Sequence, residues 1–299
     1  MKELKVLSLF DGISCGMVAL ERAGIPVKRY VAYEIDQYAT QISKKNYPDI
    51  RHHGDVFKGD FTKYKGCDLL IGGSPCTYWS IAKQGREITP DGIGGQLFMQ
   101  YVRALRESGA KYFLYENNFS IHKDIKNFIS EQLGVQPIMI NSALVSAQQR
   151  KRCYWTNIPG VTQPEDRGIL LKDILENTTT DRKVDGLITT PIRIGNIGKT
   201  TGQANRVYSV RGKSVCLQSQ AGGSGAKTGL YKIDLPDGDY IIRKLTPVEA
   251  ERLQTLPDNY TEGISNSQRY KCIGNGWTVD VIAHILSFLK EDLCTISKA

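Results

Sequence analysis

Cysteine and histidine are scarce in this chain, and neither is arranged for a disulfide framework or a metal centre. The 299 residues include seven cysteines, an odd number, and only four histidines. No two cysteines have the Cys-x-x-Cys spacing that structural zinc sites share. The sequence therefore predicts neither structural disulfides nor a bound metal ion. A single cysteine in a distinctive setting remains a candidate nucleophile.

Long apolar runs are absent as well. No stretch of 18 apolar residues occurs, so no membrane-spanning helix is predicted. The early apolar run Val6–Phe10 is too short for a signal peptide and is followed at once by Asp11. We therefore expect a protein that stays in the cytoplasm.

Acidic residues are missing from one long segment. The whole chain has 39 Lys and Arg against 31 Asp and Glu, a formal net charge of +8. The 48 residues Gly186–Ile233 contain seven Lys or Arg, nine glycines and no Asp or Glu. Such a segment can be a solvated basic face. A basic, glycine-rich backbone also suits close approach to phosphates and bases, which favours a nucleic-acid partner.

The order of apolar and amphipathic stretches predicts the fold. Over the first 160 residues, short apolar runs alternate with helical patterns. This alternation predicts an α/β fold with a doubly wound, mostly parallel sheet. Strands are expected over Leu4–Phe10, Arg29–Glu34, Cys67–Ile71 and Tyr112–Tyr115, and helices over Cys15–Ala23, Gln37–Asn46, Gln96–Ser108 and Asp124–Leu133.

We expect three segments in the chain. They are an α/β domain over residues 1–160, a smaller inserted region over 161–244, and a C-terminal segment over 245–299 that returns to the first domain. The last segment begins with Thr246-Pro247-Val248-Glu249, which has the N-cap, proline and acid of a helix start. It ends in a helix expected over Thr278–Lys290.

Acidic side chains follow successive strands of the predicted sheet. Asp11 follows the first strand within FDGISCG, Glu34 ends the second, and Asp55 follows a short extended segment. Ligands of parallel sheets bind beyond the carboxyl ends of the strands, where an acid commonly accepts hydrogen bonds from ribose hydroxyls. Asp55 could accept one from an adenine amine. Because the turn is not G-x-G-x-x-G, these residues favour S-adenosylmethionine over a dinucleotide.

Cys76 and Glu116 are the candidate catalytic pair. Cys76 lies in GGSPCTYWS, where two glycines let the backbone turn and Pro75 fixes it, so the thiol is presented on a rigid loop. We interpret it as a reactive cysteine rather than one that only fills space. Glu116 directly follows four apolar strand residues. We expect it to be partly desolvated and able to hold or deliver a proton, with a helix-capping acid as the alternative.

These motifs, in this order, resemble those of the cytosine-5 DNA methyltransferases. FDGISCG is similar to the family's cofactor turn, YEID and GDV to its ribose and adenine motifs, and SPC to its nucleophile motif. ENN is similar to its Glu-Asn-Val, QQRKR to its Gln-x-Arg-x-Arg, and GNGWTVDV to its final Gly-Asn motif. Two stretches, VSAQQRKRCYWTNIPG and GWTVDVIAHIL, look most like the animal de novo enzymes and their phage or bacterial relatives.

The resemblance implies a mechanism and a set of site residues. Cys76 would add to carbon 6 of cytosine, Glu116 would bind the ring nitrogen and the amine, and Arg150 and Arg152 would help hold the base. The expected contacts of S-adenosylmethionine are Phe10, Asp11, Gly12, Ile13, Ser14, Gly16, Glu34, Ile35, Asp55, Val56, Ser74, Asn275 and Trp277.

The resemblance also implies double-stranded DNA as substrate, with the cytosine flipped out of the stack. The loop Ala82–Gly95 is placed to close over that base, and its glycines 85, 92, 94 and 95 would allow the motion. Residues 161–244 would form the target-recognition region of a bacterial or phage-encoded enzyme, and assembly into a homo-oligomer stays open. The expected base contacts are Arg206, Tyr208, Arg211 and Gln218, and the expected phosphate contacts are Lys199, Lys213 and Lys227.

Two departures from the family pattern leave alternatives open. Asn118 stands where the family usually has Val, and Thr77 where many members have Gln or Asn. An RNA cytosine-5 methyltransferase is one alternative, disfavoured by the Thr-Tyr-Trp after Cys76 and by the long basic segment. A catalytically silent DNA-binding homologue is another, disfavoured because Cys76 and Glu116 are both present.

Overall fold

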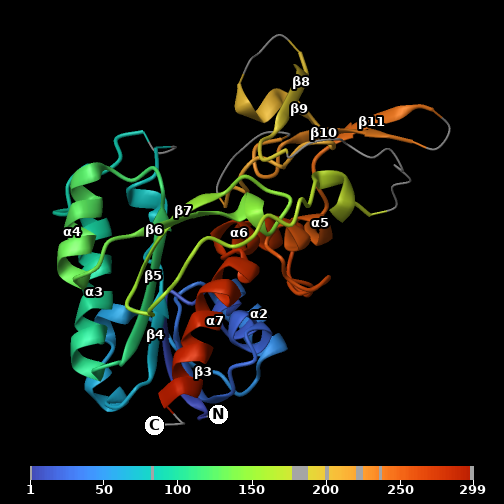
Figure 1. Cartoon of the computed structure of the whole chain (residues 1–299). Helices are drawn as coiled ribbons and strands as arrows, with labels where there is room; N and C mark the ends of the chain where they lie inside the picture. Colours follow the sequence, from blue (N-terminus) through green and yellow to red (C-terminus); the bar gives the residue numbers. More distant parts are fainter. Residues whose placement is uncertain are drawn as a thin grey trace. The chain divides into compact units, whose positions relative to one another are not determined.

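The computed structural model describes residues 2–81, 84–176, 188–198, 202–219, 225–235 and 238–296. The chain divides into two compact units (Figure 1). Unit 1 consists of residues 1–140, 151–163 and 282–299, and unit 2 of residues 141–150 and 164–281. This division differs from the expected segments 1–160, 161–244 and 245–299, because residues 141–150 and 245–281 group with unit 2.

Unit 1 is built on a seven-stranded sheet with the order β3-β2-β1-β4-β5-β7-β6. Its first five strands run parallel, and β7 is antiparallel to β5. The doubly wound, mostly parallel sheet expected from the sequence is therefore confirmed. The strands are β1 (Leu4–Leu9), β2 (Val27–Tyr33), β3 (Arg51–His53), β4 (Leu69–Gly72), β5 (Tyr112–Asn118), β6 (Ile138–Asn141) and β7 (Lys151–Thr156).

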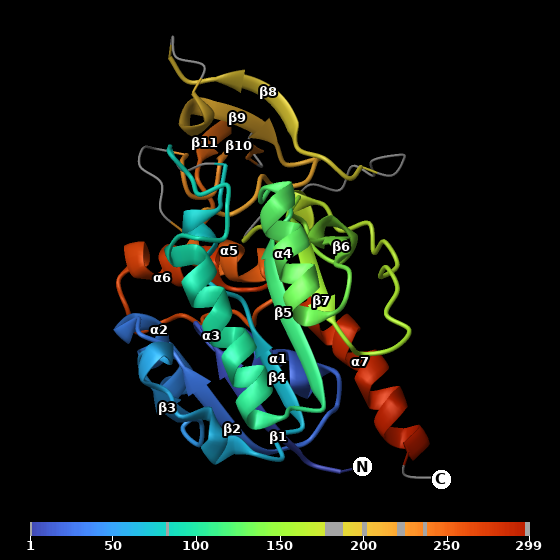
Figure 2. The same cartoon turned by 90° about the vertical axis from the view of Figure 1, so that its left-hand side faces the viewer.

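Helices cover both faces of this sheet. The chain winds outward from β1 through β2 to β3, and in the other direction from β4 to β5, so right-handed crossovers place their helices on opposite faces. Figure 2 shows α3 and α4 in front of the sheet and α1 behind it. The helices are α1 (Cys15–Arg22), α2 (Gln37–Asn46), α3 (Ile93–Ser108), α4 (Lys123–Leu133) and α7 (Val279–Ile296), of which residues from Ile282 belong to unit 1.

Helix α3 begins at Ile93, three residues before its expected start at Gln96. The first turn contains Gly94 and Gly95, which favour helices poorly when exposed. Here the glycines are buried in close packing, because a Cβ on Gly95 would lie 1.7 Å from the Pro90 carbonyl oxygen. Tertiary packing therefore overrides the helix-breaking tendency of the Gly-Gly pair.

The core of unit 1 lies between the sheet and helices α3 and α4. Leu7, Leu70 and Tyr115 on the strands pack in one buried cluster with Phe98 and Ile129 on the helices. Phe98 and Tyr101 each contact the Tyr115 ring, with ring centres 5.1 and 4.9 Å apart. Aromatic packing therefore holds α3 against the middle of β5.

Unit 2 contains a four-stranded sheet with the order β11-β10-β9-β8. Its core includes Tyr208 on β9 and Tyr231 on β10, whose ring centres are 6.0 Å apart. The strands are β8 (Ile192–Asn196), β9 (Arg206–Ser209), β10 (Leu230–Asp234) and β11 (Tyr240–Arg243), and the helices are α5 (Pro247–Leu253) and α6 (Asn266–Asn275).

The predicted start of α5 is confirmed. The Thr246 hydroxyl accepts a hydrogen bond from the Glu249 amide, and the Glu249 carboxylate accepts one from the Thr246 amide, with Pro247 at the first helical position. Arg243 also donates two hydrogen bonds of 2.7 Å to the buried Glu249 carboxylate. The cap thus joins the end of β11 to α5.

The stretch Asn266–Lys290 has the length and mean hydropathy, 1.3, of a membrane-spanning helix. It consists of two helices, α6 and most of α7, separated at Gly276–Thr278. Its apolar residues Ile282, Ile285, Leu286 and Leu289 are fully buried in the protein. The stretch is therefore accounted for as part of the core.

Lys213 corrects an expectation of the sequence, which placed it against DNA phosphates. Its side chain is fully buried, and Nζ donates hydrogen bonds to the carbonyls of Ala143, Ser146 and Ile169 at 2.7, 3.1 and 2.6 Å. Burial lowers the pKa of the ammonium group. Lys213 therefore joins three backbone segments inside unit 2 instead of facing a ligand.

We expect Lys213→Met to lower the free energy of unfolding by at least about 2 kcal/mol, because buried carbonyls would lose their donor. Lys227→Met is the matched control, since Lys227 donates only one exposed hydrogen bond, of 3.3 Å, to the Ser267 carbonyl. That control should change the free energy by less than about 0.5 kcal/mol. Denaturant titration measures both values, and equal stabilities of the two variants would contradict the structural role of Lys213.

Candidate active site

Four of the five parallel strands of unit 1 end at the same level, which the fifth, β5, passes at Tyr115. In the sheet register, Leu9 pairs with Tyr33 and with Gly72. Tyr33 pairs with His53, and Gly72 pairs with Tyr115. The residues that follow this row are therefore brought to one edge of the sheet, as the sequence predicted. They include Phe10 and Asp11 after β1, Glu34 after β2, Asp55 after β3, Ser74 and Cys76 after β4, and Glu116 within β5.

The winding direction of the sheet reverses between β1 and β4. Parallel sheets bind ligands at such a switch point, outside the carboxyl ends of the strands. The turn after β1 and the loop after β4 flank this point. The predicted cofactor turn and the predicted nucleophile thus leave neighbouring strands at the place where this fold binds ligands.

The turn after β1 has an unusual backbone. Phe10, Gly12 and Ser14 have φ values of 57°, 60° and 59°, in the left-handed region that non-glycine residues rarely adopt. The buried Asp11 carboxylate holds the turn, accepting hydrogen bonds from Ser8, Ser14 and Tyr30 at 2.6, 2.5 and 2.7 Å. Burial raises the pKa of Asp11, and these donors oppose the shift. Asp11 therefore shapes the turn from below.

Glu34 faces the same turn. Its carboxylate accepts hydrogen bonds from the amides of Gly12 and Asp36 at 2.8 and 2.7 Å. Burial raises the pKa of Glu34, while the two amides lower it. Each carboxylate oxygen has a second lone pair, so this acid fits the expected partner of ribose hydroxyls.

Exposed apolar side chains lie next to these acids. Ile35, directly after Glu34, is 80% exposed, and Phe57 near Asp55 is 47% exposed. Asp55 caps a short 3-10 helix, Val56–Lys58, by accepting a hydrogen bond from the Phe57 amide at 2.9 Å. Acids that alternate with exposed apolar side chains suit a nucleoside, so the described residues fit the adenosine portion of S-adenosylmethionine.

The loop that carries Cys76 is tied to β5. The Ser74 hydroxyl lies 2.6 Å from the Tyr115 hydroxyl, and the Asn117 side-chain amide donates to the Ser74 carbonyl at 3.2 Å. Cys76 is half-buried and begins a 3-10 helix, Cys76–Tyr78. Because Tyr115 and Asn117 point to one side of β5, Glu116 points to the other. The loop that carries the predicted nucleophile is thus attached to the strand that carries Glu116.

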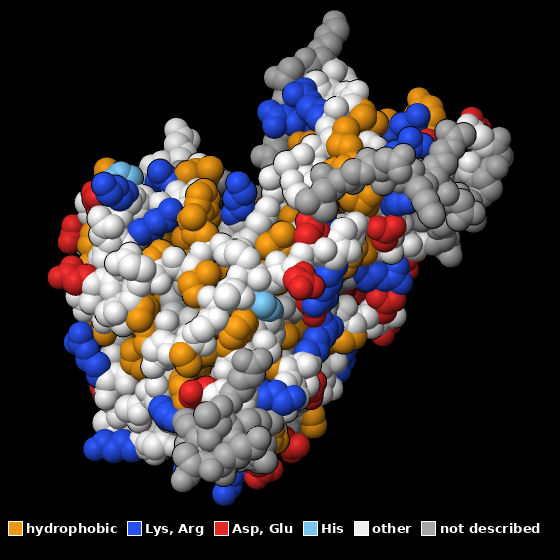
Figure 3. All heavy atoms as spheres, in the orientation of Figure 1, with side chains coloured by type: hydrophobic (Ala, Val, Ile, Leu, Met, Phe, Trp, Pro, Cys, Tyr) orange, Lys and Arg blue, Asp and Glu red, His pale blue; other side chains and the backbone are white. Residues whose placement is uncertain are grey.

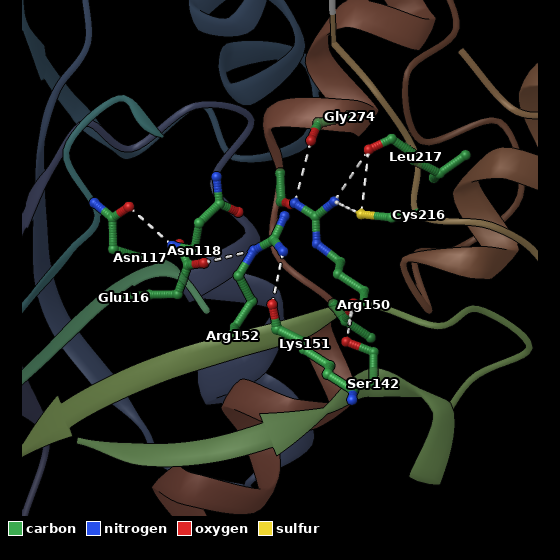
Figure 4. A network of polar contacts seen from close by, with 12 residues as sticks. Glu116, Asn117, Asn118, Ser142, Arg150, Lys151, Arg152, Cys216, Leu217 and Gly274 are labelled. Carbon is green, nitrogen blue, oxygen red and sulfur yellow. Dashed lines mark hydrogen bonds and ion pairs between the residues drawn. The ribbon is translucent and has the colours of Figure 1, made fainter. Parts of the chain in front are cut away.

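Glu116 forms an ion pair with Arg152 on β7. Arg152 Nε lies 3.0 Å from Glu116 Oε1, and both side chains are about nine-tenths buried, with 12% and 13% of their surface exposed (Figure 4). The antiparallel register places Arg152 opposite Asn118, two residues beyond Glu116 and on the same face. The structure therefore brings together two of the four predicted catalytic side chains.

Arg150 has different contacts. Its guanidinium donates to the carbonyls of Gly274 and Gly276 at 3.1 and 3.0 Å and to the Leu217 carbonyl at 3.4 Å, all within unit 2 (Figure 4). Gln148 donates to the Leu253 carbonyl at 2.8 Å. These bonds give Arg150 and Gln148 a structural role, and the expected contact of Arg150 with the base stays a prediction.

Asn275 and Trp277, the remaining cofactor predictions, lie in unit 2 at the end of α6. Two of the carbonyls that Arg150 binds, those of Gly274 and Gly276, flank Asn275. Gln254 also donates to the Gly276 carbonyl, at 3.0 Å. The turn that carries both predicted residues is therefore held through its backbone.

The glycines of the loop after Cys76 are mostly in close packing, and the motion expected of this loop stays a prediction. Ala82 and Lys83 lie outside the described residues. A Cβ on Gly94 would lie 2.4 Å from Trp79 Nε1, and one on Gly92 would lie 2.3 Å from the Glu87 carboxyl carbon. Glu87 accepts hydrogen bonds from Trp79 Nε1 and the Gly94 amide. Glycines 92, 94 and 95 thus serve close packing, and only Gly85 is in an open, left-handed position.

The predicted base contacts in unit 2 are placed unequally. Arg211 is exposed, whereas Arg206 and Gln218 are half-buried. Tyr208 is a core residue with 6% exposure, so its expected base contact is wrong. Lys199 lies outside the described residues.

Unit 2 contains an exposed strand that was not predicted from the sequence. On β8, Ile192, Arg193 and Ile194 are all exposed, and Arg193 donates to Asn196 Oδ1 at 2.8 Å. Figure 3 shows such hydrophobic side chains among Lys and Arg over the β8–β11 region. Alternation of Ile and Arg at 192–194 was the available signal.

The sequence was compared with protein families and with known proteins. The sequence pattern of a family described as C-5 cytosine-specific DNA methylase matches residues 4–184 and 166–291. The Type II methyltransferase M.HhaI of Haemophilus parahaemolyticus is 29% identical over 314 residues, covering 94% of this chain and 93% of that protein. The orphan methyltransferase M.SPRI of Bacillus phage SPR is 40% identical over 121 residues, covering 39% of this chain and 27% of that protein.

Solved structures share the fold. The methyltransferase EhMeth of Entamoeba histolytica aligns with a TM-score of 0.73 and 17% identity, covering 98% of this chain and 99% of that chain. The S. pombe Dnmt2 methyltransferase aligns with a TM-score of 0.68 and 18% identity, covering 97% and 99%. At these identities the likeness shows the architecture alone.

The site geometry predicts which thiols react in the folded protein. Among the cysteines whose burial is described, Cys76 and Cys216 are half-buried, and Cys15, Cys67, Cys153 and Cys272 are buried. Burial raises the pKa of Cys67 and of Cys153 to about 11, which makes their thiolates scarce. Brief iodoacetamide treatment followed by peptide mass spectrometry should label Cys76 and Cys216 first. Labelling of Cys67 or Cys153 at the rate of Cys76 would refute the described burial.

Proposed function

This chain belongs to the C-5 cytosine-specific DNA methylase family, and from that premise we propose that it methylates carbon 5 of cytosine in double-stranded DNA. The observation that carries the proposal is the placement of Cys76 and Glu116. They follow the register partners Gly72 and Tyr115 of adjacent strands, and hydrogen bonds tie their two segments together. A nucleophile and an acid are thereby held at one sheet edge.

The chemistry needs both groups. Carbon 5 of cytosine is a weak nucleophile until a thiolate adds at carbon 6, and Cys76 would form that carbon–sulfur bond. Glu116, held by Arg152, would contact the ring nitrogen and the amine and balance the charge that develops on the base. Loss of the carbon 5 proton and cleavage of the carbon–sulfur bond would then restore the aromatic ring.

S-adenosylmethionine would supply the methyl group as an activated sulfonium. The residues of this chain proposed to hold it in unit 1 are the left-handed turn at Phe10–Ser14, Glu34 and Asp55. Glu34 would orient the ribose, and Ile35 would offer an exposed apolar surface to the adenine. We propose Asn275 and Trp277 as further contacts.

Recognition of the DNA is proposed for unit 2. The cytosine must leave the stack, at a cost of about a few kcal/mol, before Cys76 can reach carbon 6. The basic segment Gly186–Ile233 contains no Asp or Glu, although its Lys213 is buried and its Lys232 pairs with Asp234. Arg193 and Arg211 are its exposed arginines, and β8 adds the exposed Ile192 and Ile194.

We expect Cys76→Ala to abolish methylation and covalent trapping. DNA containing 5-fluorocytosine should form a stable adduct with the wild-type protein and S-adenosylmethionine, because fluorine cannot leave as a proton does. Denaturing electrophoresis detects the adduct. Cys216→Ala is the matched control, since Cys216 is also half-buried, and this variant should still form the adduct.

Trapping, together with methylation assays on DNA and on transfer RNA, tests the alternatives. An adduct with Cys76→Ala would show that Cys76 is not the nucleophile. Methylation of transfer RNA but not of DNA would overturn the DNA substrate in favour of the RNA alternative. DNA binding with no methylation by the wild type would indicate the silent homologue.

We expect Arg193→Ala or Arg211→Ala to relax sequence preference at one base position, because an arginine–guanine pair contributes roughly 1–3 kcal/mol of discrimination. Lys227→Ala should instead weaken binding to all sequences and reduce the salt slope by about one. Methylation of a randomised DNA library, read by bisulfite sequencing, separates these effects. A uniform loss with every variant would place recognition outside the exposed arginines.

A further inference from the structure

A chain of four polar side chains runs beneath the sheet edge of unit 1. It links Asp11 and Ser14 in the turn after β1 to Ser43 on α2 and His52 on β3. Ser14 Oγ donates to Asp11 Oδ2 at 2.5 Å, Ser43 Oγ lies 2.5 Å from Ser14 Oγ, and His52 Nε2 lies 3.1 Å from Ser43 Oγ. Neither Ser43 nor His52 belongs to the site residues argued above.

Counting hydrogens gives this chain a direction. A serine hydroxyl has one hydrogen to donate. Ser14 gives its hydrogen to the Asp11 carboxylate, so Ser43 must donate to Ser14. Ser43 then has no hydrogen left for His52, so His52 Nε2 carries a hydrogen and donates it to Ser43. The donors therefore point one way, from β3 through α2 to the carboxylate.

His52 has no second anchor among the described residues. Its Nδ1 is buried and has no hydrogen-bond partner there. Burial lowers the pKa of His52, with an opposing effect of Asp11, which favours the neutral ring with a single N–H. The ring donates that N–H to Ser43, which in turn contacts Ser14 in the turn.

These hydrogen bonds reach Ser14, at the end of the turn, which Ser8 and Tyr30 do not contact. Ser8 and Tyr30 fix Asp11 to β1 and β2. Ser14, by contrast, begins α1 in a left-handed conformation and makes no side-chain cap to that helix. Its hydroxyl is held by Asp11 on one side and by Ser43 on the other. Ser43 and Ser14 are both fully buried, so water does not replace either contact.

We propose that Ser43 and His52 are positioning residues that hold the turn Phe10–Ser14 in the form that binds the methyl donor, an inference that rests on the function proposed above. They do not touch the donor themselves. They fix Ser14, and through Ser14 the backbone that presents the Gly12 amide to Glu34. Loss of these hydrogen bonds lets the turn relax and weakens the binding of S-adenosylmethionine.

The test uses the full-length protein and isothermal titration with S-adenosylmethionine. Ser43→Ala and His52→Leu should raise its Kd and its KM by about tenfold, as expected for one buried hydrogen bond, with kcat and DNA affinity within about twofold of wild type. His52→Gln keeps a donor near the Nε2 position and should restore most of the affinity. His53→Leu is the matched control, because His53 is the neighbouring residue and its Nε2 contacts Tyr64 instead.

Each outcome decides the proposal. A rise in KM confined to Ser43→Ala and His52→Leu, with rescue by His52→Gln, supports it. Variants that melt at lower temperature but bind S-adenosylmethionine like wild type reduce the chain to a purely structural role and overturn it. An equal effect of His53→Leu also overturns it. A wild-type protein that does not bind S-adenosylmethionine overturns the proposed function as well, which separates the two failures.

Discussion

The register of the parallel sheet is the constraint on which the candidate site depends. Backbone pairing aligns His53, Tyr33, Leu9, Gly72 and Tyr115 in one row, and whatever follows them must emerge at the same edge. A shift of one residue in any pairing would turn every following side chain to the other face of the sheet. The apolar side chains oppose such a shift, because β1 and β4 are buried on both faces and a shift would disrupt the packing on each face. Hydrophobic burial in the strands therefore fixes polar groups that lie beyond them.

Three carboxylates at this edge each have hydrogen-bond or ion-pair partners for their oxygens. Glu34 receives two backbone amides, Asp11 three hydroxyls, and Glu116 the Arg152 guanidinium. Lys213 in unit 2 has carbonyls as partners. Because a buried charge without partners is costly, each such group holds its neighbours in one arrangement. The price is rigidity, which suits a site where left-handed residues must be kept in place.

The sequence allowed the fold and the strand-end residues to be predicted, because both follow from local signals. Apolar runs mark the strands. Glu34 directly follows β2, Asp11 and Cys76 lie in the short segments after β1 and β4, and Glu116 lies within β5. Side-chain direction in unit 2 was not predictable in this way. Tyr208 and Lys213 lie in a basic, glycine-rich segment whose composition indicates exposure, yet the rings of Tyr208 and Tyr231 and the carbonyls around Lys213 bury them. These contacts join residues far apart in the sequence, so no local pattern reveals them.

The Gln-x-Arg-x-Arg motif shows how far a local pattern can be carried. Strand β7 begins at Lys151, so its antiparallel pairing with β5 places Arg152 beside Glu116. Arg150 precedes the strand, and its guanidinium donates hydrogen bonds to the carbonyls of residues 217, 274 and 276. A guanidinium suits both tasks, because its several N–H groups can bind one carboxylate or several carbonyls. Arg150 and Arg152 belong to one sequence motif but have different contacts. The difference arises because strand β7 begins between them, at Lys151.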